Sequence, residues 1–331
     1  MGLLYEDVII FSKHASFIRK TLEGVGDDEF RQRVRVRRVC LPYSSSVPQM
    51  ATAYPTDAIS ILASCPSLEV LVRPMLMRGD PGEAQLFQYL AEPCPPLTSL
   101  KRLDWWHRNE AAKTGGINSL VDVLKAAPNL NYLSLEGEVW MYAMQLNTTI
   151  TLRHLTTLHL RCVNILFVLQ LSKWSFPSLR NVILDRFIHD SMPETIGQSF
   201  GSHIRTLELG KSLKFYTHDA LRPILHACPH LEEVNYYVFF TARFNALQEP
   251  YGTLTTIGLH GAHNPIFDGY TDELWTHLEH HLSIWCSSFY PNLAKLVLYG
   301  DWRYILNHPR YAVWEQKWKE MRLLVEVHDS T

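Results

Sequence analysis

Leu155-Thr-Thr-Leu-His-Leu160 is the stretch that decides the fold of this chain. Its first, fourth and sixth residues are apolar, and the residues between them are polar. The same phrase, with other apolar residues at those positions, begins at nine further places: Val36, Leu68, Leu100, Leu130, Leu179, Ile204, Leu231, Leu254 and Leu293. Successive starts lie 23 to 39 residues apart. A recurring period of this size is the signature of a solenoid, in which each unit packs only on its neighbours.

The spacing within the phrase is that of the L-x-x-L-x-L core of a leucine-rich repeat. Helical patterns that end in proline precede several copies, at residues 56–66, 120–128 and 221–229, so each unit is predicted to contain a helix, a turn and a short strand. We predict an α/β fold, an irregular leucine-rich-repeat solenoid shaped as a horseshoe, with parallel strands on the concave face and helices on the convex face.

One domain is predicted over residues 1–331, with about ten repeats between residues 36 and 298. The two ends, residues 1–35 and 299–331, are predicted to be caps, because a terminal repeat has water on one side. Residues 73–99 and 260–292 are predicted to be insertions, the second with an additional helix.

The composition limits the classes of function. A net charge of −2 gives no global electrostatic basis for binding nucleic acid or an anionic membrane. No apolar run approaches the ~20 residues that span a bilayer. The cysteines at positions 65, 94 and 228 each precede a proline, and Ala127 fills the same place in another unit, which indicates a small buried position and not a disulfide framework. We expect an intracellular chain, in the cytoplasm or the nucleus.

Gly197-Gln-Ser-Phe-Gly201 matches the G-x-S-x-G nucleophile elbow, which requires a strand before the serine and a helix after it. Here a predicted helix precedes Ser199 and a strand follows, so a hydrolase is the least favoured function. No phosphate loop, dinucleotide-binding glycine motif or paired zinc-binding cysteines are present. We predict no catalytic residue and no cofactor.

His277 and His281 are spaced to share one metal ion on a helix. The same predicted helix carries Leu274, Leu278 and Leu282, which define its buried face, so the histidines are predicted to lie on a mostly solvated face and no metal site is predicted.

Five arginines lie within residues 31–38. In an extended strand Arg33, Arg35 and Arg37 would share one face, which could bind phosphate or an acidic peptide. Charge that protects an edge strand is the favoured interpretation.

The residues between the apolar positions are predicted to face outward and to align in rows across the repeats. One row reads Arg102, Tyr132, Thr157, Asn181, Thr206 and Glu233, and the next reads Asp104, Ser134, His159, Ile183, Glu208 and Asn235. Just past the strands follow Trp106, Glu136, Arg161 and Asp185.

Because binding energy concentrates in a few aromatic and arginine residues, we predict that a protein partner binds these rows. The predicted binding residues are Trp106, Tyr132, His159, Arg161 and Asp185. Trp106 is included because it follows Trp105, so one of the two must face away from the core of an extended segment.

The Cys-Pro-x-Leu-Glu phrase at residues 65–69 and 228–232 is typical of F-box-associated leucine-rich repeats. The opening at residues 3–8, followed by residues 17–22, resembles the segment just after the F-box in F-box-like proteins of mushroom-forming fungi. The resemblance extends over essentially the whole chain. It implies a substrate-recognition part of a ubiquitin ligase, in which the F-box docks on the Skp adaptor of a cullin-RING ligase and the repeats select a substrate.

The chain begins where the F-box would be ending. The expectation is therefore that this chain does not bind the adaptor by itself, and that the adaptor is a partner only if an F-box is present upstream. The alternative is a stand-alone leucine-rich-repeat scaffold without a role in ubiquitin transfer.

Overall fold

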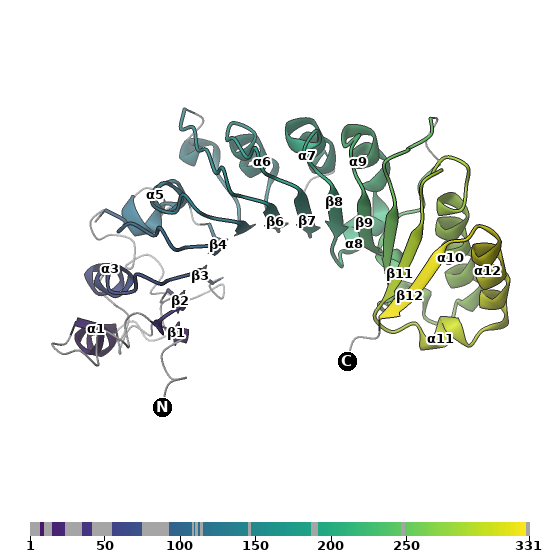
Figure 1. Cartoon of the computed structure of the whole chain (residues 1–331), viewed down its shortest axis with the longest axis horizontal. Coiled ribbons are helices and arrows are strands. Elements are labelled where there is room, and N and C mark those ends of the chain that lie inside the picture. The colour runs from purple at the N-terminus through teal and green to yellow at the C-terminus, as the bar shows by residue number, and fades with distance from the viewer. Residues whose placement is uncertain are drawn as a thin grey trace. The chain divides into compact units, whose positions relative to one another are not determined.

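The computed structural model describes residues 7–9, 15–23, 35–41, 55–74, 93–107, 109, 112, 115–144, 147–186, 191–245 and 249–328. The chain divides into two compact units: unit 1, Met1–Ser178, and unit 2, Leu179–Thr331. Each unit consists of parallel strands that alternate with helices (Figure 1). A single domain over residues 1–331 stays a prediction.

In unit 1 the strands pair in sequence order, each parallel to the next. They are β1 (Asp7–Ile9), β2 (Arg38–Cys40), β3 (Val70–Arg73), β4 (Arg102–Trp106), β5 (Tyr132–Glu136) and β6 (Thr157–Arg161). The helices are α1 (Ala15–Glu23), α3 (Pro55–Ala63), α5 (Leu120–Ala126) and α6 (Ile165–Leu171), with short 3-10 turns η2 (Gly116–Asn118) and η3 (Met141–Ala143). Figure 1 shows α3, α5 and α6 on one side of these strands.

Unit 2 repeats this arrangement, again with parallel pairing in sequence order. Its strands are β7 (Asn181–Asp185), β8 (Thr206–Leu209), β9 (Glu233–Tyr237), β10 (Thr256–His260), β11 (Lys295–Tyr299) and β12 (Leu324–His328). Its helices are α7 (Met192–Phe200), α8 (Leu213–Thr217), α9 (Leu221–Ala227), α10 (Thr271–Trp285), α11 (Arg303–Leu306) and α12 (Pro309–Glu320), with 3-10 turns η4 (Val238–Phe240) and η5 (Pro265–Phe267).

Every one of the ten phrases contains a strand, β2 to β11. The leucines predicted to form the core are at most 2% exposed: Leu133, Leu135, Leu158, Leu160, Leu207 and Leu209. The parallel pairing and the phase of burial are therefore confirmed within each unit. β1 and β12 add a strand beyond the first and last phrases, and α10 is the predicted additional helix of the second insertion.

The turn before each strand is tied to the neighbouring repeat by a recurring polar contact. The residue that precedes the phrase donates a side-chain hydrogen bond to the backbone carbonyl two residues before the preceding phrase. The pairs are Ser99 to Pro66 (2.7 Å), Asn129 to Thr98 (2.8 Å), Ser178 to Arg153 (2.7 Å), Thr253 to Pro229 (3.2 Å) and Asn292 to Gly252 (2.6 Å). Polar residues at this place thus satisfy backbone carbonyls of the turn before the preceding strand.

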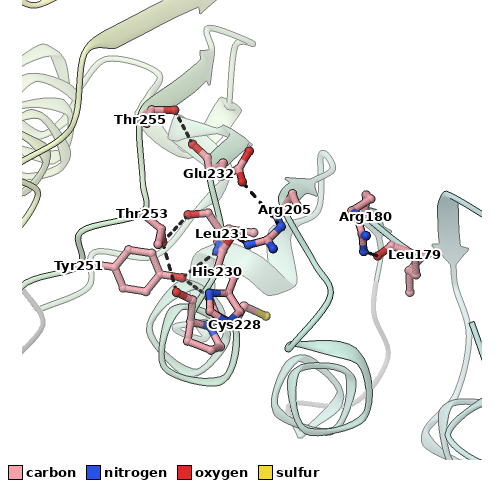
Figure 2. A network of polar contacts seen from close by, with 11 residues as sticks. Leu179, Arg180, Arg205, Cys228, His230, Leu231, Glu232, Tyr251, Thr253 and Thr255 are labelled. Carbon is pink, nitrogen blue, oxygen red and sulfur yellow. Dashed lines mark hydrogen bonds and ion pairs between the residues drawn. The ribbon is translucent and has the colours of Figure 1, made fainter. Parts of the chain in front are cut away.

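Figure 2 shows this seam where the repeats of β8, β9 and β10 meet. The Tyr251 hydroxyl donates to the Cys228 carbonyl and accepts from the Leu231 amide. The Arg205 guanidinium donates to the His230 carbonyl at 2.9 Å and lies 3.6 Å from the Glu232 carboxylate. The charged groups of this seam, Arg205 and Glu232, are therefore bound to other groups of the fold. They lie at the edge of the sheet where the strands begin.

The predicted small position before the proline is buried at Cys65, Ala127 and Cys228, whereas Cys94 is only half-buried. No disulfide joins the cysteines. Among the described residues, no helix has the length and apolar character needed to cross a membrane.

The arginine strand predicted over residues 31–38 is wrong where the structure describes it. Residues 31–34, and with them Arg33, lie outside the described residues. Arg35 has helical backbone, and β2 begins only at Arg38. The Arg38 guanidinium lies 3.7 Å from the Asp7 carboxylate of the neighbouring strand β1.

Candidate functional site

The open face of each unit consists of the third, fifth and seventh residues of the phrases. Side chains alternate along a strand, so these residues point away from the buried fourth and sixth positions. In unit 1 they form rows in register across β4, β5 and β6, which confirms the alignment predicted there. The corresponding rows of unit 2 run across β7 to β12.

Tyr132 is the centre of the open face of unit 1. Its hydroxyl is hydrogen-bonded to Nδ1 of His159 at 2.9 Å, and the two rings meet edge to face with centroids 6.4 Å apart. On its other side the Arg102 guanidinium lies 4.5 Å from the ring centroid. Nε of Arg102 also donates to both carboxylate oxygens of Asp104, at 2.9 and 3.2 Å. These contacts fix a tyrosine and an arginine in position before any partner binds.

The row of seventh residues in unit 1 consists of Trp106, Glu136 and Arg161, in register on β4, β5 and β6. Arg161 is 3.9 Å from the Glu136 carboxylate. Trp105 is buried and Trp106 half-buried, as the paired tryptophans predict. The structure therefore brings Trp106, Tyr132, His159 and Arg161 onto three adjacent strands.

Ser134 departs from the predicted pattern. The sequence predicts it to be exposed, but it is only 6% exposed. The pairing register places it between Asp104 and His159, whose larger side chains enclose its small hydroxyl. His159 and Glu208, also predicted to be exposed, are half-buried.

Asp185, the fifth predicted binding residue, belongs to unit 2. It is half-buried at the end of β7. Its carboxylate lies against Gly210, where a Cβ would be 2.7 Å from its Oδ1 atom.

The open face of unit 2 carries an aromatic row that the sequence analysis missed. The row consists of Tyr237, His260, Tyr299 and His328, the last residues of β9 to β12. The rings of Tyr237 and His260 are stacked with centroids 4.6 Å apart, and those of His260 and Tyr299 are 4.8 Å apart. These spacings match the distance between neighbouring strands. Burial lowers the pKa of His260, which favours its neutral ring.

The signal for this row was present in the sequence. Tyr237, His260 and Tyr299 are the seventh residues of consecutive phrases, so they continue, after Gly210, the line that begins Trp106, Glu136, Arg161 and Asp185. His328 belongs to β12, beyond the last phrase, and only the pairing register places it in the row.

Carboxylates gather beside the beginning of the aromatic row. Burial, with the nearby Asp185 and Glu233, raises the pKa of Glu208. Burial, with Glu208 and Asp185, also raises the pKa of Tyr237. Asn235 donates from Nδ2 to Glu233 at 2.7 Å. In both cases burial is the larger cause, and the nearby carboxylates add to it by disfavouring a further negative charge.

The other chemical candidates of the sequence lie elsewhere. Ser199 is inside α7, and its hydroxyl donates to the Thr195 carbonyl of the same helix at 2.7 Å. The predicted order of helix and strand is confirmed, because β8 follows α7.

The prediction of a solvated histidine face on α10 is wrong. His277 and His281 are 1% and 0% exposed. Nε2 of His277 donates to the Val238 carbonyl at 2.9 Å, and Nδ1 of His281 is 3.1 Å from the Tyr236 hydroxyl. Among the described residues, no group of three histidine, cysteine, aspartate or glutamate side chains is placed to hold a metal ion.

Comparison with protein-family models and with curated proteins gives no match for this chain.

Proposed function

We propose that the chain is a protein-recognition module and that its partner binds the open face of the sheet. The open face of unit 1 is the surface on which this proposal depends. It presents tyrosine, tryptophan and arginine, the residues that most often dominate interface energy, and it presents them on strands and not on loops.

The observation that carries the proposal is the contact set around Tyr132. Its hydroxyl is held by His159 at 2.9 Å and its ring by Arg102 at 4.5 Å. A side chain ordered in advance loses less conformational entropy on binding, which favours affinity. Such order is of no use to the core, because Tyr132 lies on the face opposite to the buried leucines.

The test is a double variant, Tyr132→Ala with Arg161→Ala. We expect it to lose on the order of 3 kcal/mol of binding free energy for the partner, while the melting temperature barely moves. The measurement is the set of proteins that the tagged chain captures from lysate, quantified by mass spectrometry against the wild type.

The matched control is Leu169→Ala with Lys173→Ala, which removes one large and one basic residue from an exposed part of α6 and the turn after it. It should capture the wild-type set. If the open-face variant also captures that set, recognition lies elsewhere, and the proposal is wrong.

A finer proposal rests on the sequence resemblance. We infer that the fold is a leucine-rich-repeat solenoid and that the chain selects substrates for a ubiquitin ligase as part of an intracellular F-box-like protein. Removal of the protein from its cell should then lengthen the half-life of the captured partners. Unchanged half-lives would leave the stand-alone scaffold as the better description.

A further inference from the structure

The aromatic row of unit 2 lacks a side chain at one position. Gly210 lies opposite Tyr237, because Leu209 pairs with Tyr236 and the Gly210 amide donates to the Leu184 carbonyl at 2.7 Å. The row of seventh residues therefore contains a tyrosine whose neighbour on β8 has no side chain. One face of the Tyr237 ring is stacked on His260, and the opposite face is directed toward this position.

Two carboxylates lie near that position. The Asp185 carboxylate lies against Gly210 at its base, with Oδ1 2.7 Å from the place of a Cβ. Glu208 precedes Gly210 by two residues on the same face and has no hydrogen bond or ion pair within the part of the chain that the structure describes. Glu233 is farther away, because it pairs in register with Thr206, four residues before Gly210.

Asn235 does not fill the position above Gly210. It is level with Glu208 on the neighbouring strand, and its Nδ2 atom donates to Glu233. Its Oδ1 atom lies over Gly258 of β10, 1.9 Å from the place of a Cβ there, on the side away from β8. The amide thus leans away from Gly210, and Glu208 is the carboxylate beside that position.

The lysines near this position are already engaged. Lys295, the lysine of the open face of unit 2, pairs with Glu326 at 2.8 Å. Lys211, the lysine next to Gly210, directs its ammonium toward the Phe240 ring at 5.1 Å. Among the described residues, no lysine or arginine forms an ion pair with Glu208.

We propose that the open face of unit 2 binds an arginine side chain of a basic segment in the protein partner, with the guanidinium stacked on Tyr237 above Gly210 and paired with Glu208. A planar guanidinium continues the spacing of the aromatic row and donates to carboxylates, whereas a lysine ammonium offers no flat face to stack. This inference rests on the proposed role of the open face in recognition and adds the chemical class of the partner.

The experiment uses three synthetic peptides and the full chain. One alternates arginine with serine, the second replaces arginine by lysine, and the third replaces it by citrulline, which keeps the planar shape without the charge. Affinities are measured by calorimetric titration at low and at moderate salt. We expect the arginine peptide to bind most tightly, the lysine peptide more weakly and the citrulline peptide not detectably, with affinity that falls as salt increases.

Two variants locate the binding. Glu208→Gln removes one charge without changing the shape and should weaken the arginine peptide about tenfold. Gly210→Val fills the position beside Tyr237 without changing the charge and should weaken it to a similar extent. Glu232→Gln is the matched control, because it removes an exposed carboxylate of the same unit that pairs with Arg205 in the seam of Figure 2.

Glu232→Gln should leave the affinity unchanged. Equal affinities of the arginine and citrulline peptides, equal affinities of the arginine and lysine peptides, or equal losses from Glu208→Gln and Glu232→Gln would each overturn the inference. If no arginine peptide binds while Tyr132→Ala with Arg161→Ala still abolishes partner capture, this inference fails and the proposed function stands. If the arginine peptide binds but that double variant captures every partner, the proposed centre in unit 1 fails and this inference stands.

Discussion

The two units share one buried pattern and differ on their open faces. On the open face of unit 1 the charged residues of the strands occur as pairs: Arg38 with Asp7, Arg102 with Asp104, and Arg161 with Glu136, at 2.9 to 3.9 Å. On unit 2 the carboxylates outnumber the cations and a row of stacked rings lies beside them. The apolar positions of the repeated phrase thus determine the fold, whereas the outward positions between them can differ in charge and aromatic character from strand to strand.

The largest expected effect tests the part that the units share. Leu158→Ala in unit 1 and Leu207→Ala in unit 2 should each destabilise by roughly 2–5 kcal/mol, the range for a truncated buried leucine, because both are at most 1% exposed. Thr206→Ala, next to Leu207 on the open face, should change the free energy of unfolding by less than about 0.5 kcal/mol. Denaturant melts measure all three, and equal costs for Leu207 and Thr206 would show that the phase of burial is wrong.

Acid should affect unit 2 through its buried histidines. Burial lowers the pKa of His277 to about 4, and burial next to His277 lowers that of His281 well below the usual range. Below pH 6.5 the unfolded chain binds protons that the folded chain does not, so stability is complete above pH 6.5 and is lost as the pH falls toward 4. For His277 alone the loss is roughly 3 kcal/mol.

Hydrogen exchange of α10, corrected for the intrinsic effect of pH, measures this loss. His277→Gln should reduce the pH dependence, whereas His263→Gln, at an exposed position, should not. Unit 1 has its own buried histidine, His107, whose pKa burial lowers to about 4 and whose ring packs on Phe167 of α6, so α6 should also lose protection, to a smaller extent. An α10 helix that is equally protected at pH 7 and pH 4 would contradict the account.

The smallest expected effects have opposite signs in the two units. Glu208→Gln removes a carboxylate whose raised pKa shows that its charge is disfavoured in the folded state, so it should stabilise by about 0.5 kcal/mol at neutral pH. Glu136→Gln removes the partner of Arg161 and should destabilise by up to about 0.5 kcal/mol. Replicate urea melts resolve the sign, and stabilisation by Glu136→Gln would remove the contrast between the two faces.

The strands, their parallel pairing and the rows of outward residues could be predicted, because the apolar phrase fixes both the phase and the register of each strand. Side-chain contacts within a row could not. The hydrogen bond between Tyr132 and His159 depends on the conformations of both side chains, which the register of the strands does not specify. Ser134 lies between Asp104 and His159 in its row; the sequence gives that order but not how far the two larger side chains cover the serine.

The histidines of α10 show a different limit. A helix with residues such as Leu274 and Trp275 offers more than one apolar stripe, and Leu274 is in fact half-exposed while Trp275 is buried. His277 and His281 enter the core because the Val238 carbonyl of η4 and the Tyr236 hydroxyl of β9 supply hydrogen-bond partners for them. Partners so distant in the sequence are not visible in the helix itself.

The most direct measurement of the central claim, recognition through the open face, is a site-specific photo-crosslink. A photoreactive amino acid at Thr157, which pairs in register with Tyr132 on the open face of unit 1, is compared with the same amino acid at Leu169, which is 41% exposed on α6. The crosslinked proteins are identified by mass spectrometry. The account predicts a defined protein partner crosslinked from Thr157 and absent from Leu169. The same partner crosslinked from Leu169 and not from Thr157 would contradict it.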